Sequence, residues 1–121
     1  MAAAITLNNY TTMETIELKG KQYKLDWTFT SEAYIEQAAE VLKSVGNIGK
    51  AAILAVGALR GGDWTFDKGP DWVLAQIGKD AKKMNELSDK VLKVVNEFNE
   101  FNRYEAILEG NAEAPSEGAK N

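Results

Sequence analysis

Residues 15–25 read Thr-Ile-Glu-Leu-Lys-Gly-Lys-Gln-Tyr-Lys-Leu, in which apolar and polar side chains alternate on both sides of one glycine. This two-residue period is that of a β-strand with one buried face, and the Lys-Gly-Lys at residues 19–21 interrupts it as a turn does. We therefore expect a β-hairpin over residues 13–28. Its apolar side would carry Ile16, Leu18, Tyr23, Leu25 and Trp27. A hairpin alone is only marginally stable, so the helices that follow should cover this side.

The residues after the hairpin predict two helices in succession. Thr30 is the expected N-cap of the first helix, with Phe29 and Tyr34 placed to form a hydrophobic staple. Gly46 should end that helix in a left-handed conformation, and the asparagine after it can cap the next one. The apolar positions of the first helix are Tyr34, Ile35, Ala38, Leu42 and Val45. The second helix contains residues 51–56, which are apolar all round and should therefore lie at the centre of the domain.

Two further helices are expected in the second half of the chain. Pro70 suits the first position of a helix because it lacks an N–H, and Asp71 suits the dipole of the first turn. Gly78 should break or bend the chain before a long helix over residues 80–109, which Gly110 would close. The predicted fold is thus α+β and mainly α, with an N-terminal β-hairpin packed on a bundle of about four helices, the last one long.

Length and composition fit a single hairpin-plus-helices domain over residues 13–109. Residues 1–12 would form an N-terminal extension. Residues 110–121 contain no aromatic or β-branched residue and mix Ala, Glu, Gly, Pro and Ser. Such a segment cannot bury enough apolar surface to become ordered, so we expect a disordered C-terminal tail or linker.

The composition argues against several classes of function. The net charge of −4 and the lack of a Lys/Arg cluster disfavour nucleic acid, because phosphate binding depends on clustered cations. The longest apolar run, residues 51–59, is about half of what a bilayer crossing requires, so we expect no membrane insertion. The absence of His and Cys excludes Ser-His-Asp and Cys-His catalysis. We expect a protein that is not an enzyme, carries no cofactor and works by holding another protein chain.

An acidic loop offers the one candidate for metal chemistry. Asp63, Asp67 and Asp71 recur every four residues, and three carboxylates can in principle bind a hard cation. Their spacing does not fit an EF-hand, however, and Asp71 is better explained by the first turn of a helix. The favoured interpretation is an ordinary loop with no metal, and a metal-dependent enzyme stays as the alternative.

The last predicted helix carries a narrow apolar stripe in which spacings of three and four alternate as in a heptad seam. It consists of Met84, Leu87, Val91, Val94, Phe98 and Phe101. The stripe either faces the core of its own domain or continues past it, because a helix of about 30 residues spans roughly 45 Å at 1.5 Å per residue. In the second case its C-terminal end would meet another subunit or a partner helix.

Two tryptophans on either side of the acidic loop are further candidates for contact with a partner, since exposed Trp side chains often anchor interfaces. Core capping explains them equally well. The complete set of residues predicted to bind a partner or a second copy is Trp64, Trp72, Met84, Leu87, Val91, Val94, Phe98, Phe101, Tyr104 and Leu108.

This order of elements resembles the tail assembly chaperones of long-tailed, siphovirus-type bacteriophages. The resemblance is carried by the hairpin at residues 15–25, the helix after Phe29, and the apolar helix that ends in Gly-Ala-Leu-Arg-Gly-Gly-Asp at residues 57–63. It extends through the later helices and covers roughly residues 13–108. It is a resemblance of pattern, because the family has no catalytic motif to match.

The resemblance implies a chaperone that binds the tape-measure protein, keeps it soluble and recruits tail-tube subunits during tail assembly. It also implies a homo-oligomer located in the cytoplasm of the infected host cell and absent from the mature virion. Members of the family are often made in two lengths by ribosomal frameshifting. The closing Ala-Lys-Asn at residues 119–121 is compatible with a slippery A-AAA-AAC codon sequence at that point.

Two other binding roles remain open from the sequence. One is a phage structural protein, such as a tail-completion or adaptor component, which would persist in the virion. The other is a helical protein-binding module outside tail assembly.

Overall fold

The computed structural model describes residues 14–108, with side chains for residues 14–102 and the helical backbone alone for 103–108. The predicted N-terminal extension, the C-terminal tail and the helix stop at Gly110 lie outside these residues. The elements are β1 (Glu14–Leu18), β2 (Lys21–Leu25), α2 (Phe29–Gln37), α3 (Ala39–Ser44), α4 (Asn47–Gly62), α5 (Pro70–Ile77) and α6 (Ala81–Leu108). The predicted class, a hairpin on a mainly helical fold with a long last helix, is confirmed.

The hairpin forms as the alternation predicts. β1 and β2 pair antiparallel, with Ile16 opposite Tyr23 and Leu18 opposite Lys21. Lys19 and Gly20 make the two-residue turn with φ of 50° and 84°, the two positive values that a type I′ turn requires. The expected apolar side faces the helices: Ile16, Leu18, Leu25 and Trp27 are buried and Tyr23 is half-buried.

The start of α2 corrects the predicted N-cap. Thr28, not Thr30, caps the helix, and its hydroxyl accepts the N–H of Thr30 at 3.2 Å. The Ser31 hydroxyl accepts the N–H of Thr28 at 3.0 Å, which completes a capping box. Thr28 and Thr30 are both good cap residues, and the buried Ser31 three positions after Thr28 selects the earlier one.

The predicted first helix is divided into α2 and α3 at Ala38. The N–H of Ala38 is shared between the carbonyls of Tyr34 and Ile35 at 3.0 and 3.1 Å, which tightens the last turn of α2. Neither Gly nor Pro marks this position, so the helical period did not reveal the break. Gly46 also differs from the prediction, because it is extended, with φ −84° and ψ −166°, and serves as the N-cap of α4.

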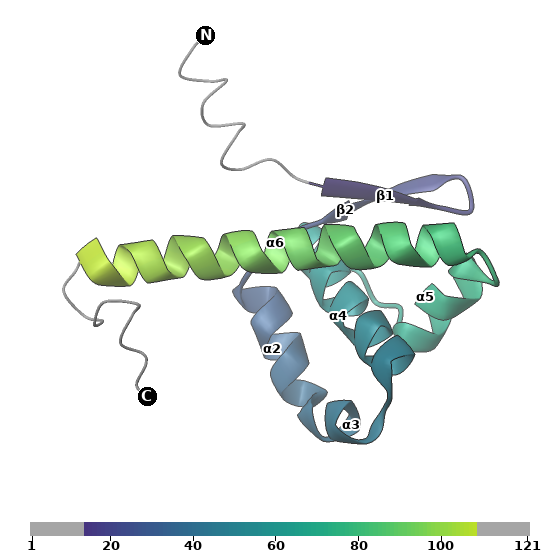
Figure 1. Ribbon diagram of the computed structural model, residues 1–121, viewed down its shortest axis with the longest axis horizontal. Coiled ribbons are helices and arrows are strands. Elements are labelled where there is room, and N and C mark those ends of the chain that lie inside the picture. Colours follow the sequence, from purple (N-terminus) through teal and green to yellow (C-terminus); the bar gives the residue numbers. More distant parts are fainter. Residues whose placement is uncertain (1–13, 109–121) are drawn as a thin grey trace, which may run out of the picture.

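α4 lies at the centre of the fold, as its uniformly apolar sequence predicts (Figure 1). It packs against α2, β2, α5 and α6. Glycine allows the closest of these approaches: a Cβ on Gly61 would overlap the carbonyl of Asp26 and the hydroxyl of Ser31. The backbone N–H of Asp26 in turn donates to the carbonyl of Ala58 at 3.1 Å, so the end of β2 is bonded directly to α4.

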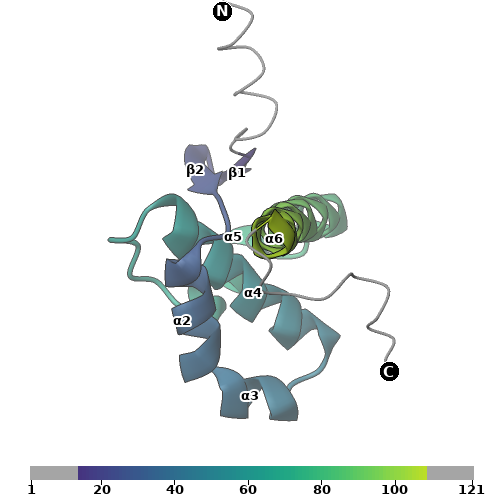
Figure 2. The same cartoon turned by 90° about the vertical axis from the view of Figure 1, so that its left-hand side faces the viewer.

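The last two helices follow the predicted start and stop signals. α5 begins at Pro70, and Gly78 breaks the chain after it with a φ of +67°. Asp80 then caps α6, since its carboxylate accepts the N–H of Lys83 at 3.1 Å. α6 runs as one long rod past the hairpin on one side and α4 on the other (Figures 1 and 2).

Two lysines fasten α6 to the first strand. The Nζ of Lys90 donates to the backbone carbonyl of Thr15 at 2.6 Å, and the Nζ of Lys93 pairs with the carboxylate of Glu14 at 2.5 Å. The carboxylate of Glu86, one turn earlier on α6, forms a salt bridge with the Nζ of Lys90 at 3.1 Å. The outer edge of β1 is therefore covered by α6.

Candidate partner-binding surfaces

The first half of the apolar stripe on α6 belongs to the core. Leu87, Val91 and Val94 are buried, and Leu87 keeps only 1% of its surface exposed. Met84 is half-buried and packs against the same core. The structure thus places four of the predicted partner-binding residues inside the domain or at its margin, which restricts a partner surface to the C-terminal half of the stripe.

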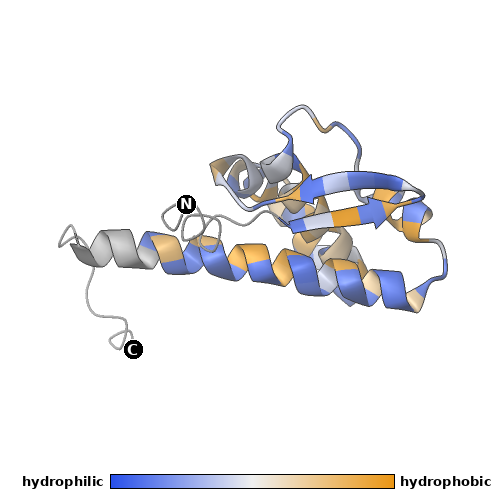
Figure 3. Cartoon of the chain, turned by 90° about the horizontal axis from the view of Figure 1, so that it is seen from above, coloured by the Kyte–Doolittle hydropathy of each residue, from blue (hydrophilic) through white to orange (hydrophobic). Residues whose placement is uncertain are grey.

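Beyond Val94 the stripe emerges at the surface. Phe98 is half-buried against the core, and its ring packs edge-to-face on Phe29 with the ring centroids 5.3 Å apart. Phe29 itself is 72% exposed and Phe101 is 62% exposed. We call Phe29, Phe98 and Phe101 the aromatic end of α6. Figure 3 shows apolar residues continuing along α6 past the part of the helix that the hairpin covers.

The far end of α6 extends beyond the other elements of the fold (Figure 1). Tyr104 and Leu108, which were also predicted to meet a partner, lie on this part of the helix, and their side chains are outside the described residues. Among the described residues, none covers Phe101 on this apolar stripe enough to bury it, since its side chain is 62% exposed.

The opposite face of α6 contains an exposed apolar residue that serves as a comparison. Leu92 is 53% exposed. It lies nine residues before Phe101, and at about 100° per residue this separation corresponds to opposite sides of the helix. Leu92 is flanked by the exposed Lys93 rather than by a further aromatic side chain. The aromatic end is therefore a feature of one face of α6 and not of the whole helix.

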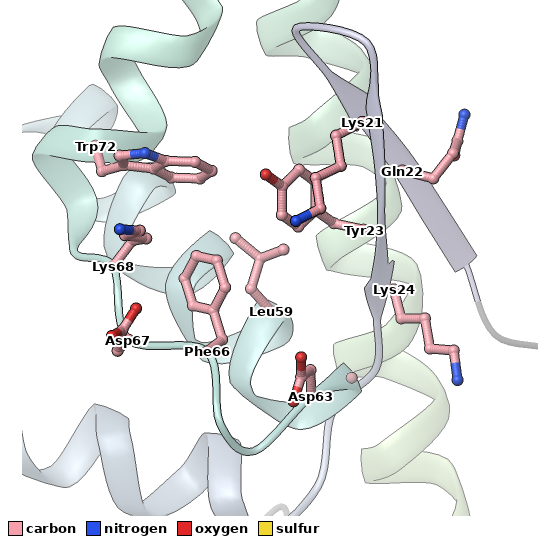
Figure 4. A pocket seen from close by; sticks show the side chains of 11 residues that line it. Lys21, Gln22, Tyr23, Lys24, Leu59, Asp63, Phe66, Asp67, Lys68 and Trp72 are labelled. Atoms are coloured by element: carbon pink, nitrogen blue, oxygen red, sulfur yellow. The ribbon is translucent and has the colours of Figure 1, made fainter.

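A second candidate surface is a pocket of ≈ 400 Å³ between β2, the end of α4 and the loop before α5 (Figure 4). Its apolar floor is formed by Tyr23, Phe66 and Trp72, with ring centroids 5.6 to 6.3 Å apart in edge-to-face contacts, and by Leu59 beneath them. Trp72, a predicted partner-binding residue, is half-buried here. Among the residues that the structure describes, the Tyr23 hydroxyl and the Trp72 indole N–H have no hydrogen-bond partner.

The rim of this pocket is charged. Lys21 and Lys24 extend from β2, Lys68 lies on the opposite loop, and Asp63 and Asp67 complete the charged lining. The Nζ of Lys21 lies over the Tyr23 ring, 5.3 Å from its centroid. The pocket lining therefore has one more cation than anions, in a chain whose net charge is −4.

The three aspartates of the acidic loop have different surroundings in the structure. Asp63 accepts hydrogen bonds from the N–H and the hydroxyl of Thr65 at 3.0 and 2.6 Å, and these bonds lower the pKa of the Asp63 carboxyl. Asp71 occupies the first turn of α5. Within the described part of the chain, no group of three acidic side chains is arranged to hold a metal ion.

Trp64 does not join the pocket. It is 79% exposed in the loop after α4, and it is absent from the pocket lining and from the core. The sequence prediction grouped Trp64 with Trp72 because both flank the same loop.

Three residues of the candidate surfaces were not predicted from the sequence. Phe29 joins the aromatic end, and Tyr23 and Phe66 meet Trp72 only through the tertiary fold.

Comparisons with known proteins gave no match, whether against protein-family models, curated proteins or solved structures. None of the helices within residues 14–108 has the length and apolar composition needed to cross a membrane.

Proposed function

We propose that this protein binds an amphipathic helix of another protein chain at the aromatic end of α6, and that it acts as a phage tail assembly chaperone. In this role it holds the tape-measure protein in soluble form and recruits tail-tube subunits in the cytoplasm of the infected cell. It is released before the mature virion forms. The observation that carries the proposal is the exposure of Phe29 and Phe101 around Phe98, at the point where α6 leaves the rest of the fold.

The chemistry of this surface suits a helix as the bound element. An amphipathic helix presents apolar side chains at spacings of three and four, and the same spacing separates Phe98 from Phe101 on α6. Two helices that share such a stripe bury it between them, as in a coiled coil. Large aromatic side chains, Phe among them, bury much apolar area at an interface and dominate its energetics. The same stripe also allows a second copy of the chain to bind, and the chaperone role includes such oligomers.

The test is co-expression with a candidate tape-measure protein, measuring the fraction of that partner in the soluble extract. The unaltered chain should keep most of the partner soluble. Phe101→Ser should lower this fraction several-fold, because it removes an exposed aromatic contact without opening the core. Leu92→Ser is the matched control, with similar exposure on the opposite face of the same helix, and it should leave the soluble fraction unchanged.

Two results would overturn the proposal. Equal loss of solubility in both variants would mean that the aromatic end has no special role. Recovery of the chain in purified virions by mass spectrometry would instead identify it as a structural component, such as a tail-completion or adaptor protein.

A further inference from the structure

The hairpin has one strand edge that α6 covers and one that faces the pocket. Tight two-residue turns place a hydrogen-bonded residue pair next to the turn, so Leu18 and Lys21 form such a pair. The pattern then alternates, and Glu17 and Gln22 form a pair without mutual hydrogen bonds. The N–H and C=O of Gln22 therefore point away from β1, toward the pocket that Lys21, Gln22, Tyr23 and Lys24 line.

Two observations agree with this assignment. Thr15 and Lys24 are the next pair of the same kind, so their carbonyls should also point away from the partner strand. The Thr15 carbonyl does so, since it accepts the Nζ of Lys90 from α6. The Lys24 carbonyl lies against α4, where a Cβ on Gly62 would overlap it. The end of α4 therefore closes the edge of β2 at Lys24 and leaves it open at Gln22.

We propose that this open edge binds a short extended segment of a partner protein as an added strand, with an apolar side chain and an acidic side chain two residues apart. A residue paired with Gln22 would accept and donate the two main-chain hydrogen bonds that β1 does not use. In the added segment, the side chains of the two residues that flank this one would point to the same side of the sheet as Lys21 and Tyr23. The spacing of the apolar and acidic residues follows from this alternation.

The side chains along the edge of β2 determine which residues of the added segment fit on either side of the one paired with Gln22. The position opposite Tyr23 meets the aromatic floor formed with Phe66 and Trp72, which suits a leucine or another apolar side chain. The position opposite Lys21 meets an exposed cation that interacts electrostatically with Asp63 but forms no salt bridge among the described residues, which suits a glutamate or an aspartate. The recognised sequence is thus apolar-x-acidic, for a segment that runs antiparallel to β2.

The partner segment binds at a site separate from the aromatic end of α6. The edge of β2 differs from that surface in both position and chemistry, because it offers main-chain hydrogen bonds and a lysine instead of an exposed phenylalanine stripe. The site does not rest on the proposed chaperone function.

The test uses the full chain, labelled with ¹⁵N, and the peptide acetyl-Thr-Leu-Thr-Glu-Thr-amide as a probe. Titration by NMR should shift the amide of Gln22 and the indole N–H of Trp72, with little change at Trp64 in the exposed loop. A copy of the probe that is N-methylated at its central Thr loses one main-chain donor, and its affinity should fall about tenfold. This control alters the ligand alone, so it does not affect the stability of the protein.

A charge exchange tests the acidic position. Lys21→Glu should bind the Glu-containing probe several-fold more weakly than the unaltered chain does. It should bind acetyl-Thr-Leu-Thr-Lys-Thr-amide several-fold more tightly than the unaltered chain does. Lys21 is exposed at the turn, so the variant should fold normally, and Phe101→Ser should leave both affinities unchanged.

Three outcomes would overturn the proposal: no shift at Gln22 with about 5 mM probe, equal binding of the methylated probe, or no exchange of preference in Lys21→Glu. A shift of the Gln22 amide on concentrating the protein alone would also overturn it, because a second copy of the chain would then occupy the edge.

Discussion

The choice between Thr28 and Thr30 as the cap of α2 shows how one residue fixes the path of the chain after the hairpin. Both threonines precede a helical sequence, so local preference does not separate them. Ser31 does, because its side chain is buried against the end of β2 and donates to the Asp26 carbonyl at 3.4 Å while it accepts the N–H of Thr28. The cap is therefore part of the joint between the hairpin and the helices.

Replacing Thr28 by Ala should lower the free energy of unfolding by about 1 kcal/mol, the usual cost of losing an N-cap side chain. Thr30→Ala is the matched control. Thr30 is exposed in the first turn of α2, where Ala is a better helix former, so the change should be within about 0.5 kcal/mol of zero. Urea denaturation of both variants measures the difference, and a larger loss in Thr30→Ala would restore the cap that the sequence predicted.

The glycines of α4 mark a limit of sequence reasoning at the same scale. Gly57 and Gly61 lie four residues apart in α4. In the structure a Cβ on Gly57 would come within 2.9 Å of the Trp27 ring, and one on Gly61 would overlap Asp26. They are close-approach positions inside a helix. Their partners are more than 25 residues away in the chain, and no local pattern reveals a contact of that kind.

Elements whose signal is local were predicted correctly. The hairpin follows from a two-residue period, α5 from a proline start, and the length of α6 from an uninterrupted apolar stripe. The division of that stripe was not predictable, because where a core ends depends on the elements that pack on it. Phe98 and Phe101 could be predicted because they continue the stripe along one helix. The contact of Phe29 with Phe98 and the cluster of Tyr23, Phe66 and Trp72 could not, because both depend on how separate elements pack.

The division of α6 predicts that the same substitution has a large effect on stability at one position and a small effect at another. Leu87→Ala should lower the free energy of unfolding by roughly 2 to 5 kcal/mol, because it opens a cavity in the core. Leu92→Ala removes the same atoms from an exposed position, and its effect should stay below about 0.5 kcal/mol. Both values come from denaturant unfolding monitored by circular dichroism. Similar losses at the two positions would contradict the placement of Leu92 outside the core.

At the scale of the molecule, the chain combines a packed body with a rod that extends past it. The body consists of the hairpin, α2, α4 and α5 together with α6 up to Phe98, which is the last residue of α6 among the described side chains that packs on the core. The two candidate surfaces lie on different parts of it: the pocket edge of β2 at the turn end of the hairpin, and the aromatic end where α6 leaves the body. This separation permits one partner at each surface.

The body and the rod can be separated by shortening the chain. A chain that ends at Asn102 keeps every buried contact that the structure describes for α6, so its Tm should lie within about 4 °C of that of the full chain. A chain that ends at Lys90 loses the buried Val91 and Val94 along with Phe98, and it should show no cooperative thermal transition. Calorimetry measures both.

Partner solubility with the chain ending at Asn102 then locates the binding surface. If the partner stays soluble, the surface consists of Phe29, Phe98 and Phe101. If the partner is lost from the soluble extract, the surface includes Tyr104, Leu108 and the residues around them.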